Sequence, residues 1–180
     1  MKKFILFFTL FILTTLSIKA QEYYWTSYSF NVDSEDTEIV AKLTNDYFST
    51  ENSKAEGVSV YLFENHFHDS SLSSSHEIVF AGTYDAMGNQ YSQGDNPSWD
   101  LYLAKLGQYT KGFSAAAGRS VHSFGVPGTH PVQNLFWLKV NDAATFAKGF
   151  KKYNSNLKDI NSITAGGTIC LPPGTLESKL

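Results

Sequence analysis

Cysteine is almost absent from this chain of 180 residues, and Cys170 is its only copy. A single cysteine excludes an internal disulfide bond, so the packing of the core has to supply the stability of the fold. That core can draw on 14 Phe, 10 Tyr and 3 Trp residues, whose rings bury large apolar areas. Cys170 lies in the apolar run TICLPPG without a positive neighbour, which predicts a small buried hydrophobe rather than a reactive thiol.

Long hydrophobic runs are missing too, except at the start of the chain. Lys2 and Lys3 precede an apolar stretch at 4–16 that is too short to span a bilayer comfortably, and Ala20 precedes a plausible cleavage point. Residues 1–20 are therefore predicted to be a secretory signal peptide. The protein is expected to be exported, to the periplasm or the outside of the cell, with no membrane attachment after cleavage.

Clusters of basic residues are also missing. The chain has 14 Lys and Arg against 17 Asp and Glu, and without the three lysines of residues 1–20 its net charge falls from −3 to about −6. Neutralisation of phosphate supplies most of the affinity for nucleic acid, and a basic patch is needed to hold anionic lipid. The composition therefore argues against nucleic acid and against a lipid surface as partners.

Two stretches of the chain repeat one pattern, a strand followed by an amphipathic helix. They are YSFNVDSEDTEIVAKLTNDYF at 28–48 and FWLKVNDAATFAKGFKKY at 136–153. Each has an apolar run ending in Val, an Asn or Asp that can cap a helix, and apolar residues at helical spacing. The surrounding pattern predicts first-module strands at 23–32, 58–68, 76–85 and 120–126, helices at 35–48 and 99–110, and a loop at 86–97. In the second module it predicts strands at 135–140 and 163–171 and a helix at 143–153.

The predicted order of the first module, βαββαβ, is that of a ferredoxin-like split βαβ unit. The predicted fold class is α+β, with a ferredoxin-like module at 21–126, a linker at 127–132 and a partial second βαβ repeat at 133–180. Two such units packed sheet against sheet make a dimeric α/β barrel, either as two chains or as one fused chain. The unfinished repeat leaves strand edges open, which favours a dimer or a longer parent chain over a closed half-module.

The segments FNVDSEDTEIVAKLTNDYF and LKVNDAATFAKGFKKY resemble the opening strand and helix of the dimeric α/β-barrel superfamily. That group includes antibiotic-biosynthesis-monooxygenase-like and stress-responsive barrel domains. The resemblance covers roughly residues 23–171 and rests on element order and hydrophobic pattern. Because members include cofactor-free monooxygenases, haem-handling enzymes and isomerases, it implies a fold and no particular chemistry, and no catalytic motif carries over.

The stretch ENHFHD at 64–69 holds the side chains best suited to bind a metal. Alternate residues of a strand share a face, so Glu64, His66 and His68 would point the same way. Two imidazoles and a carboxylate are ligands that zinc accepts, although no HExxH or CxxC signature accompanies them. The alternative is the solvated end of an edge strand, and the general expectation is a protein without a cofactor.

Six aromatic residues on predicted strands and the middle helix could line a ligand pocket between sheet and helices: Trp25, Tyr28, Tyr61, Phe63, Trp99 and Trp137. The alternative is that they form plain core. His122, on the strand predicted at 120–126, is the titratable group expected to face such a cavity as a general base. Its alternative is a hydrogen-bonded structural residue.

Several reaction classes lack their signatures, since the chain has no Gly-rich phosphate loop, no GxSxG elbow and no credible Cys–His pair. The favoured function is an exported protein that binds a small apolar or aromatic molecule or serves as an interaction domain, with a second copy as a partner. The alternative is a cofactor-independent or metal-assisted monooxygenase-like enzyme.

Overall fold

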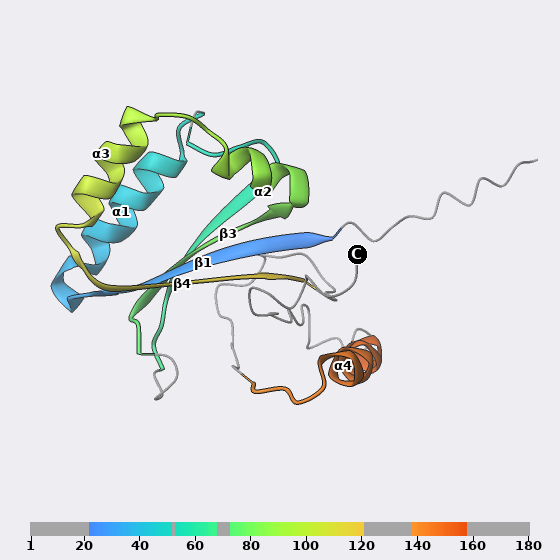
Figure 1. Cartoon of the computed structure of the whole chain (residues 1–180). Coiled ribbons are helices and arrows are strands. Elements are labelled where there is room, and N and C mark those ends of the chain that lie inside the picture. The colour runs from blue at the N-terminus through green and yellow to red at the C-terminus, as the bar shows by residue number, and fades with distance from the viewer. Residues whose placement is uncertain (1–21, 52, 68–72, 121–137, 158–180) are drawn as a thin grey trace, which may run out of the picture.

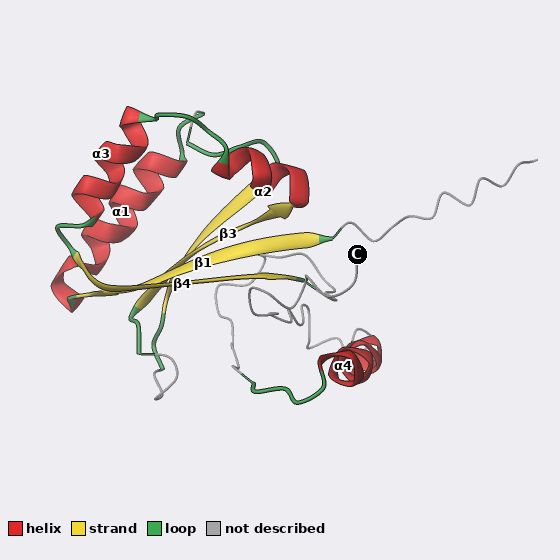
Figure 2. Cartoon of the chain, in the orientation of Figure 1, coloured by secondary structure: helices red, strands yellow, loops and turns green. Residues whose placement is uncertain are grey.

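The structure is a computed structural model that describes residues 22–51, 53–67, 73–120 and 138–157. A four-stranded sheet carries helices on one face (Figures 1 and 2). The strands are β1 (Tyr23–Val32), β2 (Val58–Glu64), β3 (His76–Thr83) and β4 (Thr110–Arg119). The helices are a 3-10 turn η1 (Ser34–Asp36), α1 (Thr37–Phe48), α2 (Tyr84–Tyr91), α3 (Pro97–Leu106) and α4 (Ala143–Leu157).

The topology of the sheet is ferredoxin-like. Its strand order is β2-β3-β1-β4, and every neighbouring pair is antiparallel. The helices between β1 and β2 and between β3 and β4 complete the βαββαβ order of that fold. The predicted α+β class and ferredoxin-like module are therefore confirmed, and β1 and β4 lie side by side although they come from opposite ends of the module.

The partial second repeat stays a prediction, because α4 is the only element described in that part of the chain. The helix predicted at 143–153 is confirmed within α4, and the carboxylate of Asp142 accepts hydrogen bonds from the N–H groups of Ala144 and Thr145 at its start. Residues 138–140, the described end of the strand predicted at 135–140, form no strand. The strand predicted at 163–171 lies outside the described residues, as do the predicted signal peptide and linker.

Two elements of the first module differ from prediction. The predicted loop at 86–97 begins instead with α2, which the Thr83 hydroxyl caps by accepting the N–H of Ala86, and which buries Ala86 and Met87. The fourth strand of the sheet is β4 at Thr110–Arg119, a segment where no strand was predicted, and residues 121–126 of the strand predicted at 120–126 lie outside the described residues. Its run of Ala and Gly has low strand propensity, but pairing with β1 along most of its length decides the conformation.

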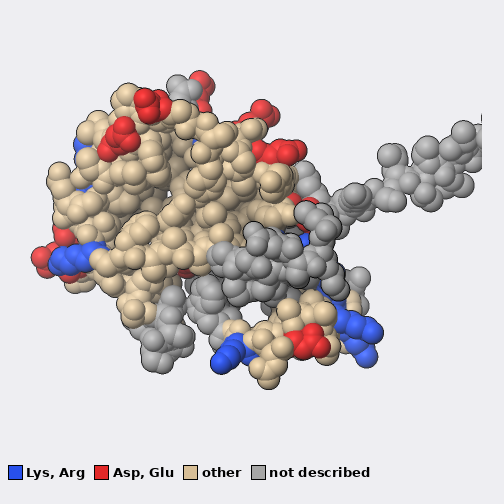
Figure 3. Space-filling model, in the orientation of Figure 1, with Lys and Arg blue, Asp and Glu red and all other residues tan. Residues whose placement is uncertain are grey.

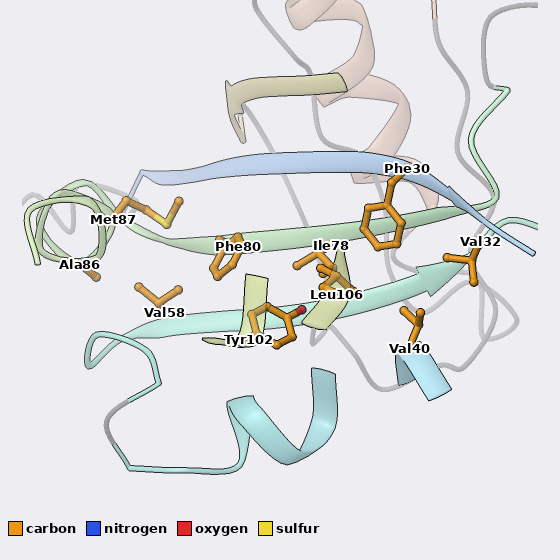
Figure 4. Packing of buried hydrophobic residues seen from close by; sticks show 10 residues of the cluster. All are labelled: Phe30, Val32, Val40, Val58, Ile78, Phe80, Ala86, Met87, Tyr102 and Leu106. Atoms are coloured by element: carbon orange, nitrogen blue, oxygen red, sulfur yellow. The ribbon is translucent and has the colours of Figure 1, made fainter. Parts of the chain in front are cut away.

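The core lies between the sheet and α1, α2 and α3 (Figure 4). Phe30 on β1 and Val40 on α1 are essentially inaccessible to water, with 1% and 0% of their surfaces exposed. Around them lie side chains from β1, β2, β3 and the other two helices: Val32, Val58, Ile78, Phe80, Ala86, Met87, Tyr102 and Leu106. This single cluster fixes the helices over β2, β3 and β1, and it leaves β4 outside the helix layer, where most of its residues are exposed.

Helix α4 lies apart from the other helices, on the opposite side of the sheet (Figure 1). Its apolar stripe includes Phe146 and Phe150, whose rings stack with centroids 5.8 Å apart. In the view of Figure 3, basic side chains gather around α4, acidic ones lie over the helix layer, and much of the surface between them is uncharged. None of the helices in the described ranges has the length and apolarity to cross a membrane.

Candidate functional site

The strands divide their side chains between two faces of the sheet. On β1 the even-numbered residues face the helices, since Phe30 and Val32 belong to the core. The odd-numbered residues, including Trp25 and Ser27, face the other way. Directly opposed residues on neighbouring strands share a face, so the pairing register assigns the residues of β3 and β4 to faces as well. Tyr28 pairs with Ile78 of β3 and with Ala115 of β4, and all three lie on the helix face.

The five predicted pocket aromatics that the structure describes do not line one site. Trp25, Tyr61 and Phe63 lie on the face away from α1, α2 and α3, where the rings of Tyr61 and Phe63 stack 6.0 Å apart. Tyr28 lies on the helix face, and Trp99 comes from α3. The physical reason is alternation, since Trp25 and Tyr28 are three residues apart on one strand and must point to opposite faces. Trp137 lies outside the described residues, as does the predicted base His122.

A continuous series of aromatic rings crosses the helix face. Phe113 of β4 stacks on Tyr28 with centroids 5.7 Å apart, and Tyr28 meets Phe80 of β3 edge-on at 5.9 Å. Phe80 contacts Phe48 of α1 at 5.6 Å, and Phe48 contacts Trp99 of α3 at 6.3 Å. The series therefore runs from the core to the surface, and its outer ring, Phe113, is 70% exposed.

Three hydroxyl groups meet beside this outer ring. The hydroxyl of Tyr91, at the end of α2, is hydrogen-bonded to the hydroxyl of Thr26 and lies 2.9 Å from that of Tyr28. Burial raises the pKa of Tyr91 well above its ordinary value, so its hydroxyl stays protonated and neutral at physiological pH. Neutral hydroxyls both donate and accept hydrogen bonds, so the cluster suits an uncharged polar group.

Two exposed alanines extend this surface along β4. Ala115 lies opposite Tyr28 and Ala117 opposite Thr26 in the pairing of β4 with β1. We call this set, Thr26, Tyr28, Tyr91, Phe113, Ala115 and Ala117, the β1–β4 surface. It combines an exposed ring, a flat floor of small side chains and a hydroxyl cluster, which together can hold a small, partly apolar molecule.

Sequence reasoning missed most of the β1–β4 surface. Tyr91 fell in the predicted loop, and Phe113, Ala115 and Ala117 lay in a segment without strand propensity. The useful signal was the alternation of β1 itself, which places Thr26 on the same face as Tyr28.

The other face of the sheet carries a buried polar pair. Ser27 is 2% exposed, and its hydroxyl donates a hydrogen bond to the carboxylate of Glu77, which is 6% exposed. The indole nitrogen of Trp25, on the same face, is buried without a hydrogen-bond partner. These groups belong to the interior of the protein and are separated from the β1–β4 surface by the sheet.

Of the two histidines that the structure describes, His76 is buried and His66 is exposed. His76 starts β3 with 3% of its surface exposed, its ring lies parallel to that of Phe30, and its Nδ1 lies 2.9 Å from the Ser75 hydroxyl. Burial lowers the pKa of His76 below its ordinary value, and the Glu64 carboxylate opposes that shift. The Ser75 hydroxyl also accepts the N–H of Val32, so the pair holds the end of β1 and has a structural role.

The predicted metal ligands are only partly described. Glu64 is the last residue of β2, so His66 lies beyond the strand and the expected strand alternation does not reach it. His68 lies outside the described residues. Within the described ranges no three His, Cys, Asp or Glu side chains are placed to hold a metal ion, and the zinc hypothesis stays a prediction.

Comparison with known proteins gives similarity of fold only. No family model matches the chain, and no curated protein matches it. Two solved structures resemble it: a DABB family protein with a ferredoxin-like fold from Mesorhizobium loti, and SnoaB, a cofactor-independent oxygenase from Streptomyces nogalater. The first is 9% identical, with a TM-score of 0.40 over 54% of this chain and 95% of the other. The second is 14% identical, with a TM-score of 0.35 over 62% of this chain and 97% of the other. Likeness at this level assigns neither a superfamily nor a chemistry to this chain.

Proposed function

We propose that this protein binds a small, partly apolar molecule on the β1–β4 surface. The observation that carries the proposal is the exposed ring of Phe113 stacked on Tyr28 beside the hydroxyl group of Tyr91. An aromatic ring held 70% exposed by a neighbouring ring offers a flat apolar contact, and the adjacent hydroxyls offer hydrogen bonds that fix orientation.

The test is a titration with the neutral probe naphthalene-2-methanol, followed by amide NMR shifts. The shifts should centre on Thr26, Tyr28 and Ala115–Ala117. Phe113→Ala should weaken binding by about twofold to tenfold, the equivalent of one aromatic contact. Phe67→Ala is the matched control, because Phe67 is 90% exposed beyond the end of β2 and should leave the affinity unchanged. Shifts spread over the whole surface, or equal affinities for both variants, would reject the site.

An interaction role for the opposite face of the sheet is a second candidate. The half-buried rings of Trp25, Tyr61 and Phe63 on that face favour it. The partner proposed is a second copy of this chain. Light scattering over a range of concentrations tests this, and a constant monomer mass would remove the proposal.

We propose that binding takes place outside the cytoplasm, and the support for export is the charged and apolar pattern of residues 1–20. N-terminal sequencing of the protein from its own host should find Gln21, or a residue near it, as the first. The enzymatic alternative needs a titratable group such as His122 or His66 in a closed pocket. His66 is exposed beyond the end of β2, and His122 lies outside the described residues.

A further inference from the structure

The β1–β4 surface ends, on the side away from Phe113, at the guanidinium group of Arg119. Arg119 lies opposite Tyr24 in the pairing of β4 with β1, two residues beyond Ala117. Two residues of a strand span about 7 Å. Arg119 is therefore the next residue after Ala117 on this face of β4, and it lies on the same face of the sheet as the hydroxyl cluster.

Among the described residues, the guanidinium makes one long contact. Its Nη1 lies 3.5 Å from Oε1 of Glu22, the long limit of a hydrogen bond, and its Nε is buried without a partner, which leaves the two Nη groups to meet a ligand. The Glu22 side chain is 59% exposed, so solvent screens this ion pair and makes it weak. A guanidinium presents a fork of N–H groups that fits a carboxylate through two parallel hydrogen bonds, and Glu22 does not use that geometry.

Glu22 is held by a different residue. Its Oε2 accepts a hydrogen bond from the Tyr24 hydroxyl at 3.0 Å, and this bond raises the pKa of Tyr24. The other charged residue of β4, Lys111, makes a closer pair at the far end of the strand, where its Nζ lies 2.7 Å from Oδ2 of Asp33. Counting only partners in the described ranges, Arg119 is thus the less completely paired of the two cations on β4, and its side chain is one-third exposed.

We propose that Arg119 binds the carboxylate of an aromatic ligand whose ring lies on the β1–β4 surface. This inference rests on the proposed function and adds the ligand class, an aromatic carboxylate. Glu22 is then a weak internal competitor that occupies the guanidinium while the ligand is absent. The ring would lie on Ala115 and Ala117 beside Phe113, and the carboxylate would reach Arg119 at the end of this surface.

The experiment compares 2-naphthoate with naphthalene-2-methanol, which have the same ring and differ in charge. The wild-type protein should prefer the carboxylate. Arg119→Gln should weaken 2-naphthoate by about tenfold, the effect expected for one charge-assisted hydrogen-bonding group, and leave the alcohol unchanged. Arg119→Lys should recover part of the preference, since it keeps the charge and loses the fork. Glu22→Gln should tighten 2-naphthoate by about threefold because it removes the competitor.

Lys111→Gln is the matched control, since it removes the other positive charge of the same strand, at the end beyond Phe113. It should change both affinities by less than about twofold, because long-range charge effects are screened by salt. Equal affinity of the wild-type protein for the two probes, or equal losses in Arg119→Gln and Lys111→Gln, would overturn the assignment of Arg119. Failure of the alcohol itself to bind would instead reject the proposed function, so the two failures are distinguishable.

Discussion

The hydroxyl oxygens of Tyr91 and Tyr28 lie 2.9 Å apart and join the end of α2 to the central strand β1. Tyr91 also shares a hydrogen bond with Thr26, so one side chain links the unexpected helix to the candidate site. Tyr91→Phe removes both links and should lower the free energy of unfolding by about 1 kcal/mol, as measured by urea denaturation.

The control for Tyr91→Phe is Tyr84→Phe in the same helix. Tyr84 is 70% exposed and contacts Tyr24 through its ring, which phenylalanine retains. Its free energy of unfolding should change by less than about 0.5 kcal/mol. If the two variants lose the same stability, the hydroxyl cluster does not hold α2 to the sheet.

The burial of His76 makes the stability of the fold sensitive to acid. Burial lowers its pKa below the ordinary 6.5, so the unfolded chain binds the proton before the folded one does. The stability that neutral His76 contributes is complete above about pH 6.5 and is lost as the pH falls, with a limiting slope of about 1.4 kcal/mol per pH unit for one proton. Urea denaturation at a series of pH values from about 7.5 down to about 5 measures this slope.

His76→Gln should flatten that dependence, although it should lower stability at neutral pH through the lost stacking on Phe30. His66→Gln is the control, because His66 is an exposed residue beyond the end of β2 and should leave the slope unchanged. A slope that survives in His76→Gln would show that another group carries the acid sensitivity.

Substitution of the residue that caps α3 tests how the start of this helix is fixed. The side-chain oxygen of Asn96 accepts the N–H groups of Ser98 and Trp99 at 3.1 and 3.2 Å, which fixes the start of the helix that carries Trp99. Asn96→Ala should cost about 1 kcal/mol of stability, and Asn96→Asp should cost much less because aspartate caps equally well. Equal losses in thermal denaturation would mean that Pro97 and packing alone set the start of α3.

The sequence pattern is sufficient to predict those strands and helices whose local sequence preference agrees with their tertiary environment. β1 alternates, α1 has a regular apolar stripe ending in Tyr47 and Phe48, and both were predicted with nearly correct bounds. β4 gives no such signal, because SAAAG is a weak strand former that pairs with β1 only through long-range contact. α2 was hidden for the opposite reason, since Gly88 and Asn89 suggest a loop, while the Thr83 cap and the burial of Met87 hold a helix.

The candidate site could be predicted only in part. Tyr28 was named among the pocket aromatics, but grouping it with Trp25 and Phe63 ignored the alternation of strand side chains. Its partners Tyr91 and Phe113 come from α2 and β4, the two elements that the pattern did not predict. Arg119 joins the site only through the pairing register between β4 and β1. A site assembled by strand pairing cannot be read from residue types before the strands are known.

Two glycines near α2 give opposite expectations for the same substitution. A Cβ atom added to Gly82 on β3 would lie 2.8 Å from the carbonyl oxygen of Gly57, whose φ of 80° favours glycine. Since that contact is with backbone, relief requires movement of the chain, and Gly82→Ala should lower stability by about 1–3 kcal/mol.

Gly88, inside α2, has no atom within 4 Å of the position that a Cβ would take. Gly88→Ala therefore removes the entropic cost of glycine in a helix and should raise the free energy of unfolding by about 0.5–1 kcal/mol. Urea denaturation of the two Gly→Ala variants measures the change in the free energy of unfolding, which should be negative at Gly82 and positive at Gly88. A gain of stability in Gly82→Ala would contradict the close approach of β3 to Gly57. A loss of stability in Gly88→Ala would contradict the helical conformation of α2, because a residue in a loop gains no helix propensity from alanine.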